Sequence, residues 1–512
     1  MANVLKRTID DGGNVFLESI LWKKTDSDTI AAWDGEPIQI YFKNTAADSW
    51  TWTDKTFFKS VFDQWTDVTR LSYRQTSDAK QADMIETIVP QKFFGAGNGG
   101  VVLGAHETPY SEMKNGVSRG WYWDQMLEGG AREGSLIYST VLHELGHALG
   151  LAHPHDKGGG SSQFPGTRYD HSVYTIMSYN DGYRFLANGK IELLEGRLGG
   201  VDQSYGLRID PGAFDIEAIQ AIYGVKQAAR GDNVYRLSDE NGYWTTPWDT
   251  GGTDTLRYDG DGRAVLDLRP ASLKQGAVDA GGGLSYVEDV YGGVTMASDR
   301  TVKTAVIERA IGGDGDDKII GNDADNRISG RGGDDTIDGG AGDVDLVNYR
   351  GHYAEYWVRI FVGGTLVDHE KGSAKVDDGF DRLKNVEYLH FADGYVSLVS
   401  GRNDAGARAA GLTFDVDGVE AGKMFSLLVG FTAGQDTIAL KDALFDGLDK
   451  GRLDADQFVL GDHAMDADDR LIFDRDARAL YYDVDGAGGA EQVLVAGFGD
   501  MVDVSARDIL VV

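Results

Sequence analysis

The chain has 512 residues, which is more than one hydrophobic core supports, so we expect two or three domains. Hydrophobic residues make up 41% and aromatic residues 10%, and these shares exclude general disorder. The formal net charge of -33, from 82 acidic and 49 basic residues, excludes nucleic acid and anionic membrane surfaces as partners, because both would be repelled. The excess of carboxylates instead suits the binding of hard cations.

With no cysteine, the chain can form neither disulfides nor thiolate metal sites, so a bound zinc would need His, Glu, Asp or Tyr ligands. Residues 1–20 form a polar lead-in or short propeptide, and they contain no apolar run of the length that a signal peptide needs. We expect no membrane insertion, because no stretch is long and apolar enough to cross a bilayer.

The next segment, residues 21–224, mixes strand and helix patterns. Ile38–Phe42 predicts a strand after a turn, and Thr53 is expected as the N-cap of a helix with Asp54 in its first turn. Apolar residues then recur at helical spacing and predict a core-facing stripe, made of Phe57, Phe58, Val61, Phe62, Trp65 and Val68. The glycine-rich Gly95–Gly100 lacks the strand–helix context of a phosphate loop, so we interpret it as a turn.

A second helix is predicted over residues 135–149, and it carries the residues of a metal site. His143 and His147 are four positions apart and therefore project from one face, where two imidazoles can hold a single ion. Glu144 lies beside them and can reach a water on that ion as a general base. Zinc as a Lewis acid and Glu144 as the base would together activate water for attack on a carbonyl.

A catalytic zinc also needs a third protein ligand and one open position, so the chain must turn back sharply after the helix. Gly150 enters the left-handed region of backbone conformation cheaply, and His153 follows shortly after it. A bare HExxH pattern is weak evidence. The longer HExxHxxGxxH pattern of His143–His153 is much more specific, because it adds the helix-ending glycine and the third histidine.

The segment His143–His153 resembles the signature of the metzincin metallopeptidases. Tyr174–Tyr179 is similar to the methionine-containing turn of that family, which implies that Met177 is the floor of the zinc site; an ordinary core methionine is the alternative. Tyr179 corresponds to the tyrosine that ligates the resting zinc in astacin-like and serralysin-like members and then stabilises the oxyanion. Pro154, after the third histidine, is typical of serralysins.

A third helix is predicted over residues 211–223, with a proline at its start and Gly224 just past its end. This stretch is similar to the helix that closes a serralysin catalytic domain. His155 departs from the glycine common at that point in the family, and we do not assign it to the metal. His106 and His171 are expected to be surface or structural residues.

Beyond residue 224, short alternating runs and Gly/Asp turns replace helical periodicity, so we expect an all-β region up to residue 512. Residues 312–347 contain a nine-residue repeat whose turns begin at glycines, namely Gly312, Gly321, Gly330 and Gly339. Each turn has an aliphatic residue at its eighth position, namely Ile319, Ile328, Ile337 and Leu346. A flexible Gly/Asp linker, the alternative, would not keep these aliphatic residues in phase.

The repeat resembles the GGxGxDxUx nonapeptide of the RTX, or repeats-in-toxin, parallel β-roll. The resemblance implies tight half-turns at the glycines and short strands whose aliphatic residues fill a narrow core. It also implies Ca²⁺ ions enclosed by carbonyls and side chains of adjacent turns. The side-chain ligands it implies are Asp314, Asp317, Asp323, Asn326 and Asp335. The fourth turn has Val344 at the sixth position, so that turn lacks the expected ligand.

Upstream of the repeat, Trp248–Thr255 resembles the WDxGGxDT segment in which serralysins bind an isolated calcium. The resemblance makes residues 230–235 the partner strand. The ligands it implies are the side chains of Asp249 and Asp254 and the carbonyls of Gly231, Asn233 and Gly251.

Two C-terminal segments also resemble RTX proteins. Asn385–Gly394 is similar to a segment that follows RTX repeats, although an ordinary strand and turn would give much the same pattern. Arg507–Val512, an acidic residue before an aliphatic tail, resembles the uncleaved signal for type I secretion. These resemblances imply export by the type I secretion machinery. Crowded carboxylates repel one another where calcium is scarce, so we expect folding that depends on calcium outside the cell.

We therefore expect a secreted, extracellular and monomeric serralysin-like zinc endopeptidase that cuts protein or peptide substrates, with Zn²⁺ and Ca²⁺ as cofactors. The expected fold is an α+β metzincin zinc-metalloprotease domain over residues 21–224, followed by an all-β C-terminal region. That region would comprise a parallel β-roll over residues 225–347 and a β-rich secretion module over residues 348–512. One alternative is a calcium-dependent surface-attached or adhesive protein whose peptidase domain is restricted or inactive. Another is an enzyme narrowed to one target protein.

Overall fold

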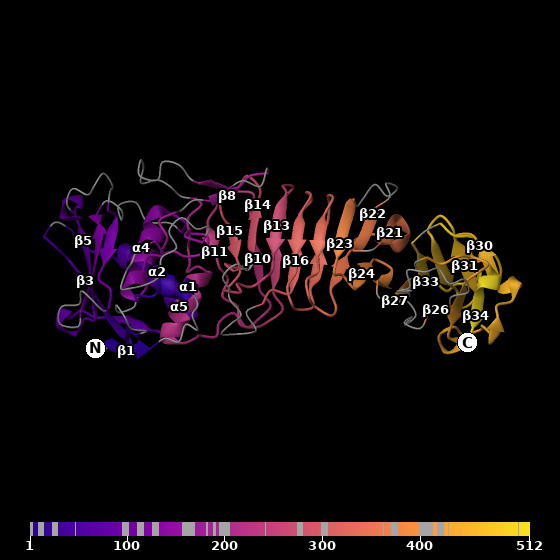
Figure 1. Ribbon diagram of the computed structural model, residues 1–512, viewed down its shortest axis with the longest axis horizontal. Coiled ribbons are helices and arrows are strands. Elements are labelled where there is room, and N and C mark those ends of the chain that lie inside the picture. Colours follow the sequence, from indigo (N-terminus) through magenta and orange to yellow (C-terminus); the bar gives the residue numbers. More distant parts are fainter. Residues whose placement is uncertain are drawn as a thin grey trace. The chain divides into compact units, whose positions relative to one another are not determined.

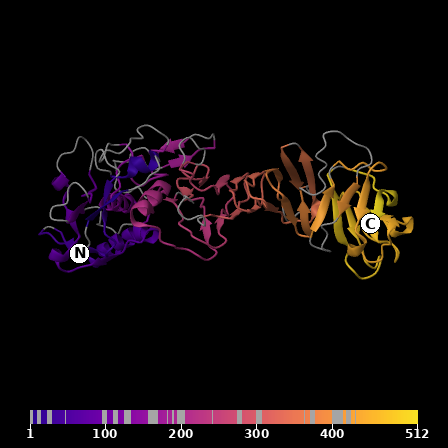
Figure 2. The same cartoon turned by 60° about the horizontal axis from the view of Figure 1, so that its bottom comes forward.

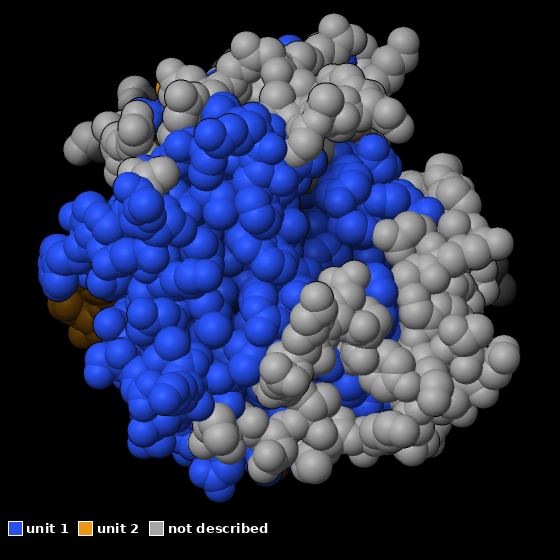
Figure 3. Space-filling view, turned by 90° about the vertical axis from the view of Figure 1, so that its left-hand side faces the viewer, with its two compact units in different colours: residues 1–256, 265–307 blue, residues 257–264, 308–512 orange. Residues whose placement is uncertain are grey.

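The chain forms two compact units in the computed structural model: unit 1 is Met1–Leu256 with Val265–Ile307, and unit 2 is Arg257–Ala264 with Glu308–Val512. Figure 1 colours them along the sequence and Figure 3 by unit. The structure describes residues 4–8, 15–22, 29–46, 48–94, 102–109, 117–124, 133–155, 169–180, 183–187, 191–193, 205–240, 242–273, 280–297, 306–361, 363–369, 377–398, 413–416, 424–428, 430–499 and 501–512. Gly95–Gly100 lies outside these residues. Within them, every helix is too short or too polar to cross a membrane.

Unit 1 contains a five-stranded sheet in the order β4-β3-β5-β7-β6 (Figure 1). Its strands are β3 (Ile38–Lys43), β4 (Tyr73–Gln75), β5 (Met84–Val89), β6 (Gly104–His106) and β7 (Ser118–Trp123). All neighbours pair in parallel except β6, which is antiparallel to β7 and forms one edge. The strand predicted over Ile38–Phe42 is confirmed.

The α-helices of the described residues are α1 (Val15–Ile20), α2 (Trp52–Val68), α4 (Leu136–Ala148) and α5 (Ala213–Tyr223). The last three confirm the predicted helices, but the N-cap of α2 is Thr51 and not Thr53. The Thr51 hydroxyl accepts from the Asp54 amide at 3.2 Å, and the Asp54 carboxylate accepts from the Thr51 amide at 2.8 Å. This reciprocal pair needs an acid three residues after the cap, and Asp54 meets that condition only for Thr51. Most of the predicted stripe is buried, namely Phe58, Val61, Phe62, Trp65 and Val68.

Side chains from distant segments hold the C-terminal end of α4. The Trp33 indole donates to the Ala148 carbonyl at 3.1 Å, and the Tyr223 hydroxyl donates to the Leu149 carbonyl at 2.8 Å. Carbonyls at a helix end have no partner within the helix, so these bonds satisfy groups that would otherwise be buried alone. Gly150 follows with φ of 106°, the left-handed conformation predicted for it, and the chain turns back there.

The C-terminal half is rich in strands, as predicted. From residue 225 onward, the described residues contain strands and short 3-10 turns but no α-helix. The other strands up to residue 295 are β1 (Val4–Thr8), β2 (Thr29–Trp33), β8 (Tyr183–Phe185), β9 (Ile191–Leu193), β10 (Val234–Arg236), β11 (Trp244–Thr245), β12 (Thr255–Arg257), β13 (Ala264–Asp267), β14 (Leu284–Val287) and β15 (Gly293–Thr295).

In unit 2, short strands recur with the period of the nine-residue repeat and pair in parallel within two sets (Figures 1 and 2). One set is β16 (Arg309–Ile311), β18 (Arg327–Ser329), β20 (Leu346–Asn348) and β24 (Tyr388–Phe391). The other is β17 (Lys318–Ile320), β19 (Thr336–Asp338) and β23 (Phe380–Lys384). Successive repeats alternate between the sets, so residues two repeats apart pair, as Ile319 does with Ile337. The predicted core positions Ile319, Ile328 and Ile337 are buried.

The fourth repeat is one residue longer than predicted. β18 and β20 pair Ile328 with Val347 and not with Leu346. Val347 is fully buried, Leu346 is half-buried and Val344 is 46% exposed. A shift of one residue turns the side chains of a strand to the opposite face, so Val347 takes the core position predicted for Leu346. Asp345 correspondingly takes the sixth position that was assigned to Val344.

A hairpin of β21 (Tyr356–Phe361) and β22 (Gly364–His369) interrupts the repeat. After the hairpin, β23 pairs in parallel with β19, and β24 pairs in parallel with β20, so both sets of strands resume. Leu383 and Leu389 occupy the buried positions that the aliphatic residues hold in earlier turns.

The aliphatic C-terminal tail is an inner strand of a four-stranded sheet. β34 (Ile509–Val511) pairs in parallel with β28 (Thr437–Leu440) and antiparallel with β29 (Gly451–Arg452), and both Ile509 and Val511 are buried. The remaining strands are β25 (Gly394–Ser397), β26 (Thr413–Val416), β27 (Met424–Leu428), β30 (Phe458–Leu460), β31 (Leu471–Asp474), β32 (Ala479–Tyr482) and β33 (Val493–Phe498). The domain boundaries at residues 20, 224 and 347 stay predictions.

The register of the fourth repeat can be tested by a pair of truncations. Val347→Ala should lower the free energy of unfolding of unit 2 by about 2 kcal/mol, because it leaves a cavity at a fully buried position. Leu346→Ala, at a half-buried position, should cost less than about 1 kcal/mol. Urea unfolding of the full-length protein in calcium, followed at fluorine-labelled Trp357, measures both values. A larger loss for Leu346→Ala would contradict the register.

Candidate metal centre

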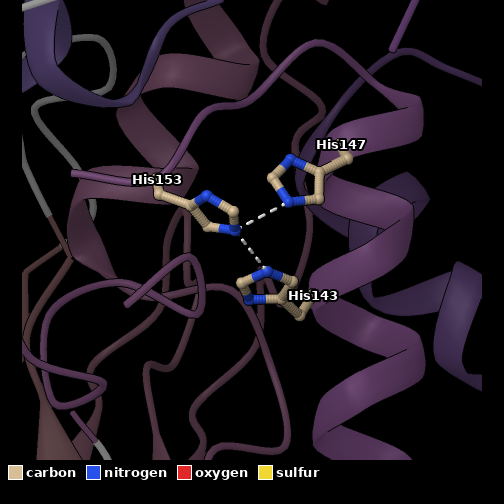
Figure 4. Close-up of side chains that lie close together, drawn as sticks. All are labelled: His143, His147 and His153. Carbon is tan, nitrogen blue, oxygen red and sulfur yellow. Dashed lines mark hydrogen bonds between the residues drawn. The ribbon is translucent and has the colours of Figure 1, made fainter. Parts of the chain in front are cut away.

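Three histidines of unit 1 bring their imidazoles together (Figure 4). His143 and His147 project from α4, and His153 comes from the segment that turns back after Gly150. The Nε2 atom of His153 lies 3.1 Å from that of His143 and 3.0 Å from that of His147. Within the described ranges, these histidines form the cluster whose ligand atoms all lie within 4.8 Å of one another.

Backbone carbonyls decide which nitrogen of two of these rings carries the proton. His143 Nδ1 lies 2.7 Å from the Ile176 carbonyl, and His147 Nδ1 lies 2.9 Å from the Leu151 carbonyl. A carbonyl oxygen only accepts, so each Nδ1 donates and each neutral ring keeps its lone pair on Nε2. Both lone pairs face His153 Nε2, which carries at most one proton and can donate it to only one of them, whereas a bound cation can accept all three nitrogens. The residues therefore fit a metal ion, and three imidazoles are a ligand set of catalytic zinc.

Met177 lies fully buried against α4. A Cβ atom on Gly146 would stand 2.5 Å from the Met177 sulfur, so the helix can approach this closely only because residue 146 is glycine. Met177 therefore lies directly beneath the helix that carries His143 and His147.

The turn beneath α4 is held by Asp215, near the start of α5. Its carboxylate accepts hydrogen bonds from the Thr175 hydroxyl at 2.6 Å, the Ile176 amide at 2.6 Å and the Gly212 amide at 2.8 Å. The Ile176 carbonyl in turn accepts from His143, so Asp215 fixes the orientation of that ring through one intervening residue. Burial raises the pKa of Asp215 to about 6, and the three hydrogen bonds oppose that rise.

Glu144 is 8% exposed and follows His143 on α4. Burial raises its pKa to about 7, while the charge of His106 and a hydrogen bond from the His106 backbone lower it. A carboxyl group with a pKa near neutrality can both take up and release a proton at physiological pH.

Tyr179 lies at the solvent side of the cluster and is 54% exposed. Its ring centroid is 5.4 Å from that of His143 and 4.5 Å from that of His153. His155 stacks on His153 at 5.1 Å, but its Nδ1 lies 3.4 Å from the Asp170 carboxylate and so is not directed at the cluster.

Two buried carboxylates near the cluster were not recognised in the sequence. Asp215 follows Gly212 at the spacing of a helix-capping acid, which was an available signal. Glu86 stands in a mostly apolar strand, where a lone acid indicates a buried partner. That partner is His106, which was expected to be surface or structural and is fully buried, 3.2 Å from Glu86. His171, which carried the same expectation, is partly exposed.

The residues expected to bind an isolated calcium lie together in unit 1. Asp254 accepts from the Asn233 amide at 2.8 Å, and Asp249 accepts from the Gly251 amide at 3.1 Å. The Gly231 carbonyl contacts the same loop. These contacts bring the two segments together, and the segments offer the oxygen atoms that Ca²⁺ prefers. The Asn233 carbonyl itself accepts from the Thr255 amide at 2.9 Å.

The sixth positions of the repeat form a hydrogen-bonded ladder within each set of strands. Asp335 accepts from the Asp317 amide at 2.8 Å, and Asp345 accepts from the Asn326 amide at 2.7 Å. The second carboxylate oxygens of Asp335 and Asp345 are buried and have no hydrogen-bond partner among the described residues. Burial raises the pKa of Asp317 to about 6 and that of Asp345 to about 7, and burial together with Asp381 raises that of Asp335. Buried carboxylate oxygens without donors fit a divalent cation.

The other two acids expected to bind calcium, Asp314 and Asp323, stand at the third positions of their turns. Both side chains are exposed, so the structure keeps them apart from the buried ladder.

Asp381 and Glu387 extend the ladder and were not predicted. Asp381 accepts from the Asp335 amide, and Glu387 accepts from the Asp345 amide, each at 2.9 Å. Each acid precedes a buried leucine by two residues, which is the spacing of the sixth and eighth positions and was an available signal. The intervening hairpin breaks the period of nine, so a search for a constant period ends at residue 347.

Comparisons with known proteins agree with both parts of this description. Residues 32–161 match the family profile Matrixin, of peptidase family M10, and residues 213–440 match the profile Peptidase M10 serralysin C terminal. The chain is 30% identical to serralysin from Proteus mirabilis over 315 residues, which cover 56% of this chain and 57% of that protein. It is 29% identical to serralysin from Photorhabdus laumondii over 330 residues, covering 58% and 60% of the two chains. It is 27% identical to metalloprotease AprA from Pseudomonas entomophila over 342 residues, covering 60% and 63%.

The chain thus spans less than two thirds of the length of these relatives. The resemblance predicted from the sequence is confirmed in both parts.

The link from Asp215 to the histidine cluster can be tested directly. Asp215→Asn should weaken zinc binding by about 10- to 100-fold, because the Ile176 carbonyl that orients His143 is no longer held by a carboxylate. Competition with a chromophoric chelator measures the affinity. Asp54→Asn is the matched control: it also removes a carboxylate that caps a helix, costs about 1 kcal/mol of stability and should leave zinc affinity unchanged. Equal zinc affinities for the wild type and Asp215→Asn would contradict the link.

Proposed function

Because the chain carries a metzincin domain followed by a serralysin C-terminal domain, we propose that it is a serralysin-like zinc endopeptidase that hydrolyses peptide bonds in proteins. The proposal is supported above all by the convergence of three Nε2 atoms beside a buried glutamate. His143, His147 and His153 would hold Zn²⁺, and Tyr179 would be a further ligand in the resting state. The presence of all three histidine ligands, the glutamate and the tyrosine in one place argues against an inactive peptidase domain.

Each remaining residue of the site has a role in the proposed reaction. Bound Zn²⁺ supplies Lewis-acid activation of water and of the scissile carbonyl. Glu144 takes the proton of the attacking water and passes it to the leaving amine, and its pKa of about 7 suits both transfers. The exposed phenol of Tyr179 donates to the oxyanion. Met177 and Gly150 are structural: one lies beneath the ligand helix, and the other makes the turn that brings back His153.

We further propose that the strands of residues 225–347 include a parallel β-roll that binds Ca²⁺. The alternating sets of parallel strands and the buried sixth-position ladder support this proposal. Asp317, Asn326 and Asp335 would be ligands as predicted, and Asp345 replaces Val344 in the fourth turn. The isolated site of Asp249 and Asp254 would bind a separate calcium ion.

The same proposal covers localisation. The carboxylate ladder needs a cation, and calcium is plentiful outside cells, so folding of unit 2 would follow export. The repeat and the acidic-aliphatic tail support export by the type I secretion machinery, with residues 348–512 as the secretion module. We propose that the protein is an extracellular monomer.

The proposed activity depends on one carboxylate. Glu144→Ala should keep zinc bound and lower the hydrolysis rate of a casein-type substrate by at least about 100-fold, because the general base is lost. Zinc content by atomic absorption and hydrolysis of labelled casein measure the two properties on the same sample. Proteolysis at the wild-type rate by the zinc-loaded variant would show that Glu144 is not the base.

Calcium removal tests the second half of the proposal. Each site saturated at 100 times its dissociation constant stabilises the folded state by about 2.7 kcal/mol, so a calcium chelator should lower the thermal midpoint of unit 2. Calorimetry on full-length Glu144→Ala protein, which avoids self-digestion, makes the measurement. Asp335→Asn should reduce the calcium-dependent shift, and Asp343→Asn, an exposed acid outside the ladder, should not. Identical midpoints with and without calcium would argue against the β-roll assignment.

A further inference from the structure

A charged pair crosses the edge of the sheet of unit 1 over a glycine. Glu86 of β5, Gly120 of β7 and His106 of β6 stand opposite one another in register on three adjacent strands. His106 Nε2 lies 3.2 Å from Glu86 Oε1. A Cβ atom on Gly120 would stand 2.1 Å from Glu86 Oε2 and 2.6 Å from His106 Cδ2. The two side chains can therefore meet only because the strand between them carries no side chain at this position.

The hydrogen-bond partners of His106 favour a doubly protonated ring. Nδ1 lies 3.0 Å from the Glu107 carbonyl and 3.1 Å from the Ser118 hydroxyl, and that hydroxyl donates to the same carbonyl at 2.7 Å. Nε2 lies against the Glu86 carboxylate, so both nitrogens face oxygens that accept. Both side chains of the pair are completely buried. Burial lowers the pKa of His106, but the charge of Glu86 and the hydrogen bonds to Glu86 and Glu107 together outweigh burial, so the pKa is raised.

This pair lies on the face of the sheet that meets α4. Tyr122, two residues after Gly120 on β7, projects to the same face. A Cβ atom on Gly104 of β6 would stand 3.0 Å from Glu144 Cγ and 3.5 Å from the Tyr122 ring. The Glu144 side chain therefore lies over β6, two residues from His106. The charge and the backbone of His106 both act on the Glu144 carboxylate, since both lower its pKa.

Stability alone is a weak reason for a buried ion pair at this position. Removing two charges from water costs several kcal/mol, and well-packed apolar side chains of similar volume are often as stable or more so. The strands around the pair are apolar enough to supply such packing, since Met84 and Ile88 of β5 are both buried. A pair that is costly to bury and lies next to the general base points to a role at that base.

We propose that His106, held by Glu86 across Gly120, is a positioning residue for Glu144. Its ring is held between two acceptors, so β6 keeps a positive charge at a fixed place beside the carboxylate that handles the proton. The inference rests on the proposed peptidase function and adds to the residues that serve it. It also accounts for two glycines, because Gly120 leaves room for Glu86 and His106 and Gly104 leaves room for Glu144.

The test uses full-length protein loaded with zinc and calcium. His106→Gln and Glu86→Gln should each lower kcat for a peptide substrate by about 10- to 100-fold, with KM and zinc content near the wild-type values, since a misplaced base slows proton transfer without changing binding. Arg119→Gln is the matched control. It breaks an ion pair, 3.2 Å long, between Arg119 of β7 and Glu107, which directly follows β6. Arg119 and Glu107 neighbour Gly120 and His106 in the chain, so their side chains alternate to the other face. Its kcat should equal that of the wild type.

Two further measurements separate positioning from a structural role. In the Glu144→Ala background, His106→Gln should lower the residual rate no further, because the two residues act as one unit. Nitrogen-15 spectra of the wild type, assigned with His106→Gln, should show both ring nitrogens of His106 protonated at neutral pH.

Three outcomes would overturn the inference: wild-type kcat in the zinc-loaded His106 and Glu86 variants, an undiminished His106→Gln effect in the Glu144→Ala background, or a neutral ring in the wild type. If the wild type cleaves peptides, Glu144→Ala does not, and His106→Gln is fully active, the positioning role falls and the peptidase stands. A wild type without zinc-dependent cleavage would overturn both.

Discussion

Two hydrogen bonds from imidazole to backbone decide what the histidine cluster of unit 1 can hold. His143 and His147 donate through Nδ1 to carbonyls, so both keep an Nε2 lone pair that faces His153 Nε2. Neither carbonyl is free to move. The Leu151 segment is tied to α4 by the bond from its amide to the Gly146 carbonyl at 2.9 Å, and the Ile176 segment is tied to α5 by Asp215. The ligand geometry thus depends on three chain segments that only folding brings together.

The helix that carries the ligands is held at its C-terminal end, at the contact of Gly146 with Met177 and at the contact of Glu144 with β6. At its C-terminal end, the Trp33 indole and the Tyr223 hydroxyl occupy carbonyls that the helix leaves without partners. Beneath it, Gly146 admits the Met177 sulfur, and on the side of the sheet Gly104 admits Glu144. At both contacts a Cβ atom in place of the glycine hydrogen would force the Met177 or the Glu144 side chain to shift. The site is therefore specified as much by missing side chains as by the histidines.

The sequence predicted well where chemistry and local spacing coincide. HExxH on a helix and a glycine before the third histidine specify a local structure, and the structure has it. Prediction failed where the partner is distant in sequence. The roles of Asp215 and Glu86 depend on contacts with Ile176 and His106, which no local pattern encodes. The N-cap of α2 was misplaced by two residues because Thr51 and Thr53 are equally good caps until the position of Asp54 is considered.

The repeat shows a related limit. A fixed period of nine located three core residues correctly, and a single inserted residue then moved the fourth from Leu346 to Val347. A strand tolerates no partial slip, so one residue changes every side-chain assignment that follows. The turns at Asp381 and Glu387 were not predicted because a hairpin separates them from the regular repeats. Their strands nevertheless rejoin the same two sets.

Anomalous scattering at the zinc edge from crystals of the zinc-loaded full-length protein tests the central claim most directly. The account predicts one strong peak enclosed by the Nε2 atoms of His143, His147 and His153, at about 2.0–2.1 Å from each. A peak elsewhere, or none at this cluster in protein shown to contain zinc, would contradict it.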